Sequence, residues 1–537
     1  MLLTALIFLP LVFGLGLSVI KDDAVVKKLT LAFLIAEFLL SLFLFAKFDP
    51  ESAKLQLVER HDWIAAIGVQ YFVGIDGLSF WLVLLTTFLT PLALLSGWTS
   101  VDKKVKAFCF ALLALETTMV GTFVSMNAIL FYCFFEASLI PMYFMIGIWG
   151  GTRRLYATVK FFIFTMAGSI FMLLGIITLM FLTASQNGGQ ISASLLDFYK
   201  LHIPFVQDEF FSTQTLLFFA FAVAFAIKVP VFPFHTWLPD AHVEAPTPGS
   251  VILAGVLLKM GTYGFLRFAI PIFPQAAEQW AWAFMLVGVF GVIYGALVAM
   301  VQPDMKKLVA YSSVSHMGYI MLGMFAMNTQ GVSGALYQML NHGVSTGALF
   351  MLVGFVYERT HTREIKNYGG LASAAPLFTI LFVIVTMSSI AVPLTNGFVG
   401  EFLILLGTFS ANKIIAGFAV TGVVLGATYM LWMVKKVFYG EEAGVVLEHK
   451  AHGLELNTRE ILAIVPLIIL IFWMGLSSNT FMHWSKASVE NLVQNHGQYQ
   501  LTIKEDEVEK SLEKAVAANS AKKVLKATIS HEAKNEL

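Results

Sequence analysis

The chain has 537 residues, of which 58% are apolar and only 13% charged, and its formal net charge is zero. An ordinary globular protein carries about 25% charged residues, so this composition indicates a polytopic membrane protein embedded in a lipid bilayer. The zero net charge gives no support for a nucleic-acid partner or a polybasic lipid tether.

Motifs for cofactors are missing from the sequence. Cys109 and Cys133 both lie in apolar stretches, and no CxxC or His/Cys cluster is present to hold zinc, haem or an iron–sulfur cluster. Neither GxGxxG after a strand nor GxxxxGK[ST] occurs, so we predict no nucleotide site. The first apolar run starts at Leu2 without a basic segment or a small-residue cleavage site, which favours a retained span over a signal peptide.

A membrane crossing needs about 20 apolar residues, and by this measure we predict 14 spans. They cover residues 2–20, 28–47, 77–98, 106–126, 128–149, 157–183, 214–239, 248–270, 279–301, 307–327, 332–357, 373–410, 413–438 and 461–481. Most connections are short, which favours antiparallel neighbours. Longer ones cover 48–76, 184–213 and 439–460.

The seventh span is interrupted in the stretch IKVPVFPFH, where Lys228 closes an apolar run. Proline has no N–H group to donate, so Pro230 and Pro233 should break the helix. The carbonyls of Ala226 and Val229 are then expected to lack helical partners. A break at membrane depth is tolerated only where protein or water covers it, and such breaks carry ion and substrate sites in transporters.

The spans also show a positional repeat. Spans 4 to 8 and spans 9 to 13 are each five helices long, and the fourth member of each set is broken, at Pro230/Pro233 in span 7 and at Pro393 in span 12. A unit with an odd number of crossings re-enters the membrane from the opposite side, which is typical of an inverted repeat. We therefore predict an all-α membrane fold with two inverted five-helix repeats. The predicted units are 1–105, 106–270, 271–440 and 441–537.

Lysine and arginine are concentrated in alternate connections. With the N-terminus outside, the cytoplasmic connections hold most of them, whereas the opposite short connections hold only Lys47, Lys54, Arg60, Lys200 and Lys413. The positive-inside rule then places both termini on the outer, periplasmic side. In the polar tail, Val508, Leu512 and Val516 recur every four residues and predict an amphipathic surface helix.

Several ionisable residues lie inside the predicted spans, where a charge costs about 2.5–3.5 kcal/mol even on lenient scales. The candidates are Glu37, Glu116, Glu136, Lys228, Lys259, His316, His342 and Glu401. The ordinary alternative for each is a packing or assembly contact with a neighbouring helix. Nothing in the sequence around Glu37 and Glu116 favours a function over that alternative.

The charges at the two breaks match the nearer helix dipole. Lys228 ends a half-helix, where the negative end of the dipole favours a cation, and Glu401 follows the second break near the start of a half-helix that Asn396 could cap. Lys259 is flanked by glycines that allow close helix approach and leave room for water. Glu136 lies in mid-span.

His316 and His342 are surrounded by hydroxyls and glycines, and histidine can pass a proton between two sites near neutral pH. Their spacing does not resemble a metal site. Carboxylates, lysines and imidazoles separated by small polar residues suit a hydrated proton wire better than a substrate pocket.

Two long motifs carry a family resemblance. HTWLPDAHVEAPTPGSVILAGVLLKMGTYGFLRF, starting at His235, and QPDMKKLVAYSSVSHMGY, starting at Gln302, resemble the proton-conducting subunits shared by complex I and the multisubunit cation/proton antiporters. The similarity runs from span 4 to span 13. The stretch FEASLIPMYFMIGIWGG and Glu401, where sister subunits usually carry lysine, are similar to the pattern of one complex I subunit type.

The resemblance implies a role for each of six residues. Glu136 and Lys228 would form the input pair, Lys259 the central proton carrier, His316 the connection between the halves, Glu401 the terminal site, and His342 a lesser member of the path. Thr346 stands where some members carry a lysine. The Glu136–Lys228 separation would set the proton affinity of the lysine, because burial and a nearby carboxylate act on it in opposite directions.

The resemblance also implies partners and a location. The chain would hold no cofactor, while flavin, iron–sulfur clusters, NADH and quinone belong to other subunits of a bacterial inner-membrane complex, including sister antiporter-like subunits and a peripheral redox arm. Two other transporters stay open, a subunit of a cation/proton antiporter and a subunit of a membrane hydrogenase or ferredoxin-driven complex. A third class is a structural membrane scaffold whose charges serve assembly.

Overall fold

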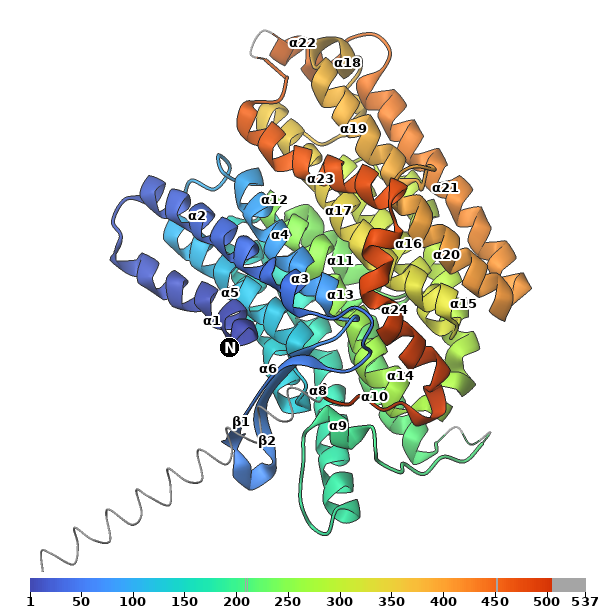
Figure 1. Ribbon diagram of the computed structural model, residues 1–537. Helices are drawn as coiled ribbons and strands as arrows, with labels where there is room; N and C mark the ends of the chain where they lie inside the picture. The colour runs from blue at the N-terminus through green and yellow to red at the C-terminus, as the bar shows by residue number, and fades with distance from the viewer. Residues whose placement is uncertain (208, 210, 451–452, 505–537) are drawn as a thin grey trace, which may run out of the picture.

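The computed structural model describes residues 1–207, 209, 211–450 and 453–504, and most of them are helical (Figure 1). The amphipathic helix predicted around Val508, Leu512 and Val516 lies outside the described residues. Apolar helices form because a backbone in lipid must satisfy its own hydrogen bonds.

The first three predicted spans form a layer at one side of the molecule (blue in Figure 1). They correspond to α1 (Leu2–Gly16), α2 (Asp23–Ser41) extended by α3 (Phe43–Lys47), and α4 (Phe80–Ser96). The long connection before α4 holds an antiparallel hairpin of β1 (Gln56–Ile64) and β2 (Val69–Ile75). The prediction of helices alone missed this hairpin.

The first predicted five-helix set contains the helices from α5 to α14. Their bounds are α5 (Val105–Val124), α6 (Ala128–Ala137), α7 (Leu139–Trp149), α8 (Arg154–Gln186), α10 (Thr213–Lys228), α11 (Trp237–Glu244), α12 (Thr247–Ile252), α13 (Leu258–Gly264) and α14 (Ile270–Ile272). The short α9 (Leu195–Phe198) lies in the connection after α8. Two π-helical segments, η4 (Leu253–Leu257) and η5 (Phe265–Ala269), flank α13 and join α12 to α14.

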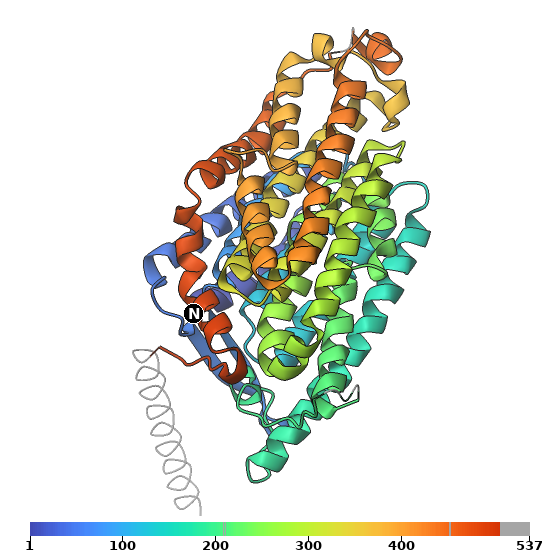
Figure 2. The same cartoon turned by 90° about the vertical axis from the view of Figure 1, so that its right-hand side faces the viewer.

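The second set and the C-terminal helices complete the fold. Their bounds are α15 (Pro274–Met300), α16 (Met305–Phe325), α17 (Thr329–Thr360), α18 (Leu371–Ala374), α19 (Pro376–Ser389), α20 (Asn396–Ala411), α21 (Lys413–Phe438), α22 (Val445–His449), α23 (Thr458–Leu476) and α24 (Asn479–Gln494). Figure 2 shows the long helices of this set lying side by side.

The described residues contain eleven helical segments long and apolar enough to cross a membrane, together with the shorter apolar helices α4, α10, α19 and α20. Both predicted breaks are confirmed, one between α10 and α11 and the other between α19 and α20. Pairing each broken helix with its second half gives the predicted set of spans.

Corresponding helices of the two five-helix sets make corresponding contacts. In the first set α5 packs on α6, α7 on α8, and α8 on α10; in the second α15 packs on α16, α16 on α17, and α17 on α20. The helix after each break also contacts the broken one, through α10 with α13 and α20 with α21. This pattern agrees with a five-helix unit used twice.

Polar side chains cap the starts of several spans. Asp22 accepts the N–H groups of Ala24 and Val25 at the start of α2, and Asn127 does the same for Ile129 and Leu130 at the start of α6. Side-chain oxygens at this position satisfy N–H groups that the helix itself leaves free, which is worth about 1 kcal/mol. Similar caps at Ser212, Asp304, Asn328 and Asn412 fix where later helices begin.

The described chain ends meet at one side of the molecule. The amino group of Met1 lies 2.6 Å from Glu59 Oε1, and Leu55 pairs with Ile503. Lys504 Nζ lies 2.9 Å from Asp49 Oδ2, and this lysine holds the pKa of Asp49 below its usual range. The N-terminus therefore shares a side with the last described residues; which side of the membrane this is remains a prediction.

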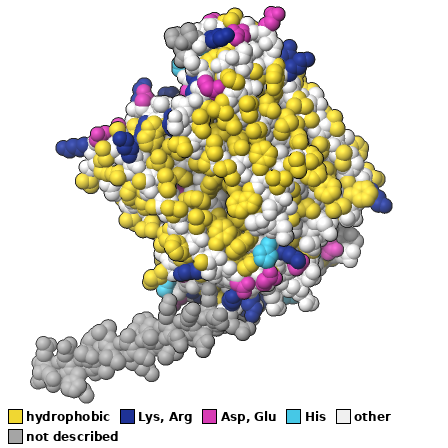
Figure 3. Space-filling view, turned by 45° about the horizontal axis from the view of Figure 1, so that its top comes forward, with side chains coloured by type: hydrophobic (Ala, Val, Ile, Leu, Met, Phe, Trp, Pro, Cys, Tyr) yellow, Lys and Arg dark blue, Asp and Glu magenta, His cyan; other side chains and the backbone are white. Residues whose placement is uncertain are grey.

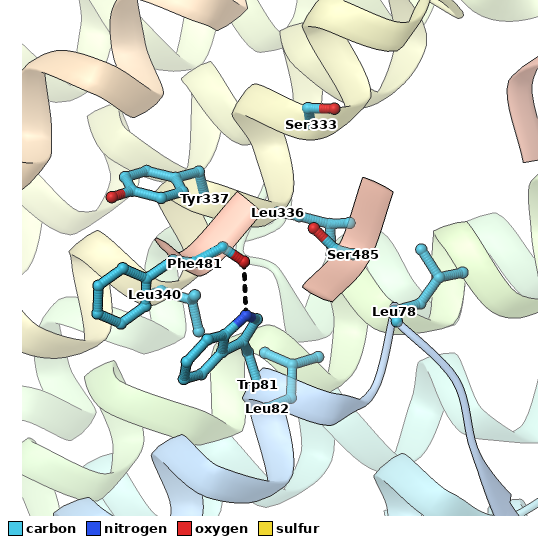
Figure 4. Close-up of a pocket in the computed structure, with 10 residues that line it drawn as sticks. Leu78, Trp81, Leu82, Ser333, Leu336, Tyr337, Leu340, Phe481 and Ser485 are labelled. Atoms are coloured by element: carbon cyan, nitrogen blue, oxygen red, sulfur yellow. Dashed lines mark hydrogen bonds between the residues drawn. The ribbon is translucent and has the colours of Figure 1, made fainter. Parts of the chain in front are cut away.

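The surface and the C-terminal packing are those of a lipid-embedded bundle. Figure 3 shows a face covered with hydrophobic side chains, with charged groups gathered at its ends. Near one end, the Trp81 indole of α4 donates to the Phe481 carbonyl of α24 at 2.8 Å (Figure 4). Together with residues of α17 these helices line a small, mainly apolar pocket. Figure 4 shows Tyr337 and Leu340 on its α17 side.

Candidate functional site

The first break is stabilised by two hydrogen bonds that the sequence does not reveal. Pro230 cannot donate to the Ala226 carbonyl, but the N–H of Val231 does so at 2.9 Å. The Trp237 indole N–H donates to the Ile227 carbonyl at 2.9 Å. The Ala226 carbonyl thus lacks the helical partner that Pro230 would have supplied, as expected, and it accepts instead from an N–H beyond the end of α10.

Lys228 is the last residue of α10 and is only 2% exposed. Its ammonium donates to Ser138 Oγ at 3.1 Å and lies 4.7 Å from the centre of the Phe135 ring. The Ser138 hydroxyl in turn donates to the Phe135 carbonyl at 2.7 Å. Ser138 joins α6 to α7, so the lysine is held at the small irregularity between these two helices.

Glu136 lies one residue after Phe135 on α6 and is close enough to Lys228 to feel its charge. However, no ion pair within 4.0 Å joins these two described residues, and Lys228 bonds Ser138 instead. Oε1 of Glu136 is buried without a hydrogen-bond partner, and the Ser169 hydroxyl of α8 lies beside the carboxyl. The two residues of the predicted input pair thus lie near each other without a direct ion pair, and each has a different serine beside it.

Lys259 is fully buried in α13, directly after the first π-helical segment. Its ammonium donates to the Ala254 carbonyl at 2.5 Å and contacts Nδ1 of His342 at 2.7 Å. A π-helical turn loosens the usual hydrogen-bond ladder and is frequent at functional sites. Here the π-helical turn lets the Lys259 side chain bond a carbonyl of its own helix and also contact His342 on α17.

His342 has two different sides. Nδ1 faces Lys259, and a charged lysine can only donate, so a neutral imidazole in this contact carries its proton on Nε2. That nitrogen is buried and has no hydrogen-bond partner among the described residues. The ring centre lies 5.8 Å from that of His316. His342, which the resemblance makes a lesser member, therefore lies between Lys259 and His316.

His316 of α16 continues the contacts to Glu401. Nδ1 of His316 lies 3.0 Å from Glu401 Oε1, while Nε2 lies 3.4 Å from the Ser389 hydroxyl. Gln338 of α17 also donates to the same carboxylate oxygen at 3.1 Å. Glu401 is 4% exposed, so its charge is held by buried donors. The four residues Lys259, His342, His316 and Glu401 are here called the polar row.

A small cavity with polar side chains in its wall borders the middle of the polar row, with room on the order of one water molecule. It is lined by His316, Gln338, Asn341, His342, Ser345, Thr346, Ser388, Ser389 and Gly397. A site with several polar partners is one that can hold water. Both imidazoles reach this cavity, so it offers a route between them.

The second break is arranged differently from the expectation. Thr395 occupies the N-cap position of α20 and Asn396 is the first helical residue, so the predicted capping by Asn396 is wrong. Its side chain instead accepts from the Ser388 hydroxyl at 2.5 Å and donates to Ser345 Oγ at 3.1 Å. Asn396 thereby ties the end of α19 to α17. Gly400 is required beside it, because a Cβ there would meet the Gln338 and Asn341 amides at 2.5 and 2.6 Å.

Other polar residues of the site escaped the sequence analysis. Gln338 and Asn341 are joined by a 2.9 Å hydrogen bond and contact the polar row, but an amide inside a span is no stronger a signal than serine or threonine. Arg267 forms a fully buried ion pair with Asp76. Neither residue stands out in the sequence, because Arg267 is part of the long motif and Asp76 ends a polar connection. Glu37 and Glu116, which the sequence did not single out, lie next to each other.

The geometry therefore joins four of the six predicted residues through a line of contacts from α13 through α17 and α16 to α20. Glu136 and Lys228 form a separate group at the first break. Among the described residues, no group of three His, Cys, Asp or Glu side chains could hold a metal ion. Lysine, imidazole and carboxylate side chains can each accept and donate a proton, and here they follow one another in space.

Two family models together match most of the chain. The family model described as NADH:quinone oxidoreductase/Mrp antiporter, TM matches residues 125–426, and the one described as NADH-ubiquinone oxidoreductase chain 4, amino terminus matches residues 5–122. NADH-quinone oxidoreductase subunit M of Rhodobacter capsulatus is 45% identical over 503 residues, which cover 92% of this chain and 97% of that relative.

Solved structures with the same fold include chains of a respiratory complex and of an Mrp complex. A chain of respiratory complex I from Thermus thermophilus with bound NADH has a TM-score of 0.79 at 31% identity, over 91% of this chain and 99% of that one. A chain of the Mrp complex from Dietzia sp. has the same TM-score at 19% identity, over 93% and 98% of the two chains. At that identity the second likeness concerns the fold alone.

Proposed function

Because the chain belongs to the subunit M and chain 4 family of NADH:quinone oxidoreductase, the proton-translocating complex I, we propose that the polar row carries protons through its interior. The observation that supports this is the row of titratable side chains from Lys259 to Glu401. Direct contacts of 2.7 Å and 3.0 Å join its two ends, and the rings of His342 and His316 lie 5.8 Å apart in its middle. Electron transfer from NADH to quinone takes place in other subunits and drives the movement.

The two imidazoles can each accept a proton on one nitrogen and release one from the other. His342 would receive a proton on Nδ1 from Lys259 and release one from Nε2 toward the cavity. His316 would take it up on Nε2, beside Ser389, and deliver one from Nδ1 to Glu401. Such a relay needs no movement of the backbone, only turning of the side chains and of water in the cavity.

Lys228 and Glu136 form the proposed input to the polar row. An unperturbed lysine has a pKa of about 10.4 and holds its proton too tightly to release it near pH 7. Whether Lys228 is bonded to Ser138 or approaches Glu136 changes the balance between burial and charge that sets its proton affinity. Conformational changes driven by the redox subunits would act by changing this separation.

The assembly follows from the same proposal. The sister antiporter-like subunits would lie beside this chain in the membrane, and a peripheral arm would hold the flavin, the iron–sulfur clusters and the NADH site, with quinone at its junction with the membrane subunits. The membrane is the bacterial inner membrane, with both termini on the periplasmic side. The units 1–105, 106–270, 271–440 and 441–537 are proposed as a three-span unit, two inverted repeats, and a final span with its tail.

Glu136→Ala is expected to lower NADH-driven proton pumping by about a hundredfold, the lower end of the range typical of a positioned proton-transfer group. The reason is that the nearby carboxylate of Glu136 is removed, and its distance from Lys228 is what changes the proton affinity of the lysine. Proton uptake by vesicles containing the intact complex measures the effect, after a native gel has confirmed assembly. The control is Cys133→Ser, an exposed position one turn earlier on α6. Normal pumping by Glu136→Ala would exclude the input role.

Glu401→Lys is expected to keep proton conduction but to change the number of protons pumped per NADH oxidised. A lysine can still exchange protons with His316, whereas its charge is opposite to that of the carboxylate at the end of the polar row. Simultaneous measurement of proton uptake and NADH oxidation gives the ratio. Glu278→Gln on the surface of α15 provides the control. An unchanged ratio would show that the charge of this site does not set the coupling.

The fold similarity to the Mrp complex leaves ion exchange as an alternative within the wider family. Glu401 and the sequence identity to the subunit M relative favour complex I. Purification in mild detergent separates the two cases, because flavin and iron–sulfur proteins accompany the chain only in a redox complex.

A further inference from the structure

We propose that Glu37 of α2 and Glu116 of α5 form a proton-binding carboxyl pair, apart from the polar row, which is protonated at rest and releases one proton at alkaline pH. The pair lies among α2, α4 and α5, in the part of the chain before the two five-helix sets. Its proton binding does not depend on the function proposed for the polar row.

The two carboxyls meet in the interior of the molecule. Glu37 is 3% exposed and Glu116 is fully buried, and their side chains lie close enough to interact across the contact between α2 and α5. None of their four oxygens has a hydrogen-bond partner among the described residues. Unpartnered buried carboxyls of this kind are costly unless they are neutral.

Hydroxyl groups of α4 and α2 lie near the pair. Thr90 of α4 lies beside Glu116, and Thr87, one turn earlier on α4, lies 2.8 Å from the Ser41 hydroxyl of α2. Ser41 is one turn after Glu37, so it lies on the same face of α2 as that carboxyl. The carboxyl pair is thus accompanied by three hydroxyls on the neighbouring helix faces.

The nearby hydroxyls are bonded to carbonyls of their own helices. Thr90 donates to the Thr86 carbonyl at 2.8 Å, and Ser41 donates to the Phe38 carbonyl at 2.7 Å. In this arrangement the Thr90 oxygen is an acceptor toward Glu116, and a protonated Glu116 can donate to it. Two buried carboxyls with so few donors around them are favoured in the neutral form at rest.

No ion pair within 4.0 Å joins either carboxyl to a cation among the described residues. α1 and α4, which pack against α2 and α5, have no charged side chain. The other helices that contact α5 include α6 with Glu136 and α13 with Lys259, the latter on the far side of α4. Lys27 lies ten residues before Glu37, and its ammonium donates to the carbonyls of Trp98 and Val101. Cys109 lies two turns before Glu116 on α5. One carboxyl can nevertheless lose its proton, because the O–H of the other can then donate to it.

Loss of that proton would change the proton affinity of the polar row, which lies on the other side of α4. On its opposite side, α4 packs Leu89 against Gly255 and Leu85 against Gly343, which are neighbours of Ala254 and His342. The carboxyl pair and the Lys259–His342 contact are thus separated by about one helix diameter, roughly 10 Å. A unit charge at this distance in protein surroundings changes a proton affinity by about tenfold, or about one pH unit.

The test uses the purified intact complex with Glu37→Gln, Glu116→Gln and the double variant. Infrared spectra recorded against pH, with hydrogen–deuterium exchange to identify carboxyl bands, compare each variant with the wild type. We expect two protonated carboxyls at neutral pH that are absent from the double variant, one of which converts to carboxylate on alkaline titration. Each single variant should lack one of the two. Two carboxylates at neutral pH, or two acids that never titrate, would overturn the proposal.

A second readout follows if the polar row carries the protons. The negative charge formed at alkaline pH holds protons on the row, so in the double variant the alkaline limb of the pumping profile should lie about one pH unit lower. Thr118→Val is the matched control, since this buried hydroxyl on α5 bonds only its own helix. A shifted infrared titration with an unshifted pumping profile would uphold the proton site and contradict its effect on the row.

Discussion

Lys259→Ala is expected to abolish most NADH-driven proton pumping, by about a hundredfold or more, while the complex still assembles. The ammonium of Lys259 contacts Nδ1 of His342 at 2.7 Å, and alanine removes this contact together with the proton carrier. Proton uptake by vesicles, normalised to the amount of assembled complex on a native gel, measures the loss.

Lys259→Arg distinguishes proton transfer from charge alone. Arginine keeps a positive charge beside His342 but has a pKa above about 12 and does not release its proton. If Lys259 acts as a carrier, the arginine variant pumps as poorly as the alanine variant. If the residue only provides a fixed charge, the arginine variant pumps normally, and the proposed role of the polar row is excluded.

The spans and both breaks could be predicted from the sequence because they follow from local composition. Long apolar runs identify the spans, and proline beside an ionisable residue identifies the breaks next to Lys228 and Glu401. The candidate residues of the polar row are also visible locally, since any charge in an apolar run is costly. The hairpin β1–β2 was missed because its strands lie in a polar connection with no clear alternation.

Contacts between distant residues could not be predicted in the same way. Lys259 and His342 are 83 residues apart in the chain, and their direct contact depends on how α13 packs against α17. The meeting of Glu37 with Glu116 likewise depends on α2 lying against α5. Spacing within a helix indicates which face a side chain occupies, but it does not tell which helix faces it.

Local rules also failed where tertiary contacts outweighed them. Asparagine is a good N-cap residue, yet the amide of Asn396 bonds Ser388 and Ser345, and Thr395 takes the cap position. Glu136 and Lys228 are opposite charges in neighbouring spans, yet the ammonium bonds the Ser138 hydroxyl. In both cases a polar group bonds a residue of another helix, and the sequence alone does not show that the two helices are in contact.

Arg267→Leu is expected to destabilise the chain by about 3–5 kcal/mol, the range for breaking a buried ion pair from one side. Arg267 and Asp76 are both fully buried and in direct contact. The arginine also donates to the Tyr263 hydroxyl at 3.0 Å, and the second oxygen of Asp76 has no partner among the described residues. Without the arginine, the aspartate charge remains inside the protein with little compensation.

The physical origin of this cost can be tested with the double variant Asp76→Leu/Arg267→Leu. Removing both charges also removes the penalty of burying them, so the double variant should be clearly more stable than Arg267→Leu alone. Retention of the chain in the complex at increasing temperature measures the difference. Equal loss in the single and double variants would show instead that packing of the arginine stem, and not the unpaired charge, holds the start of α4 against the second π-helical segment.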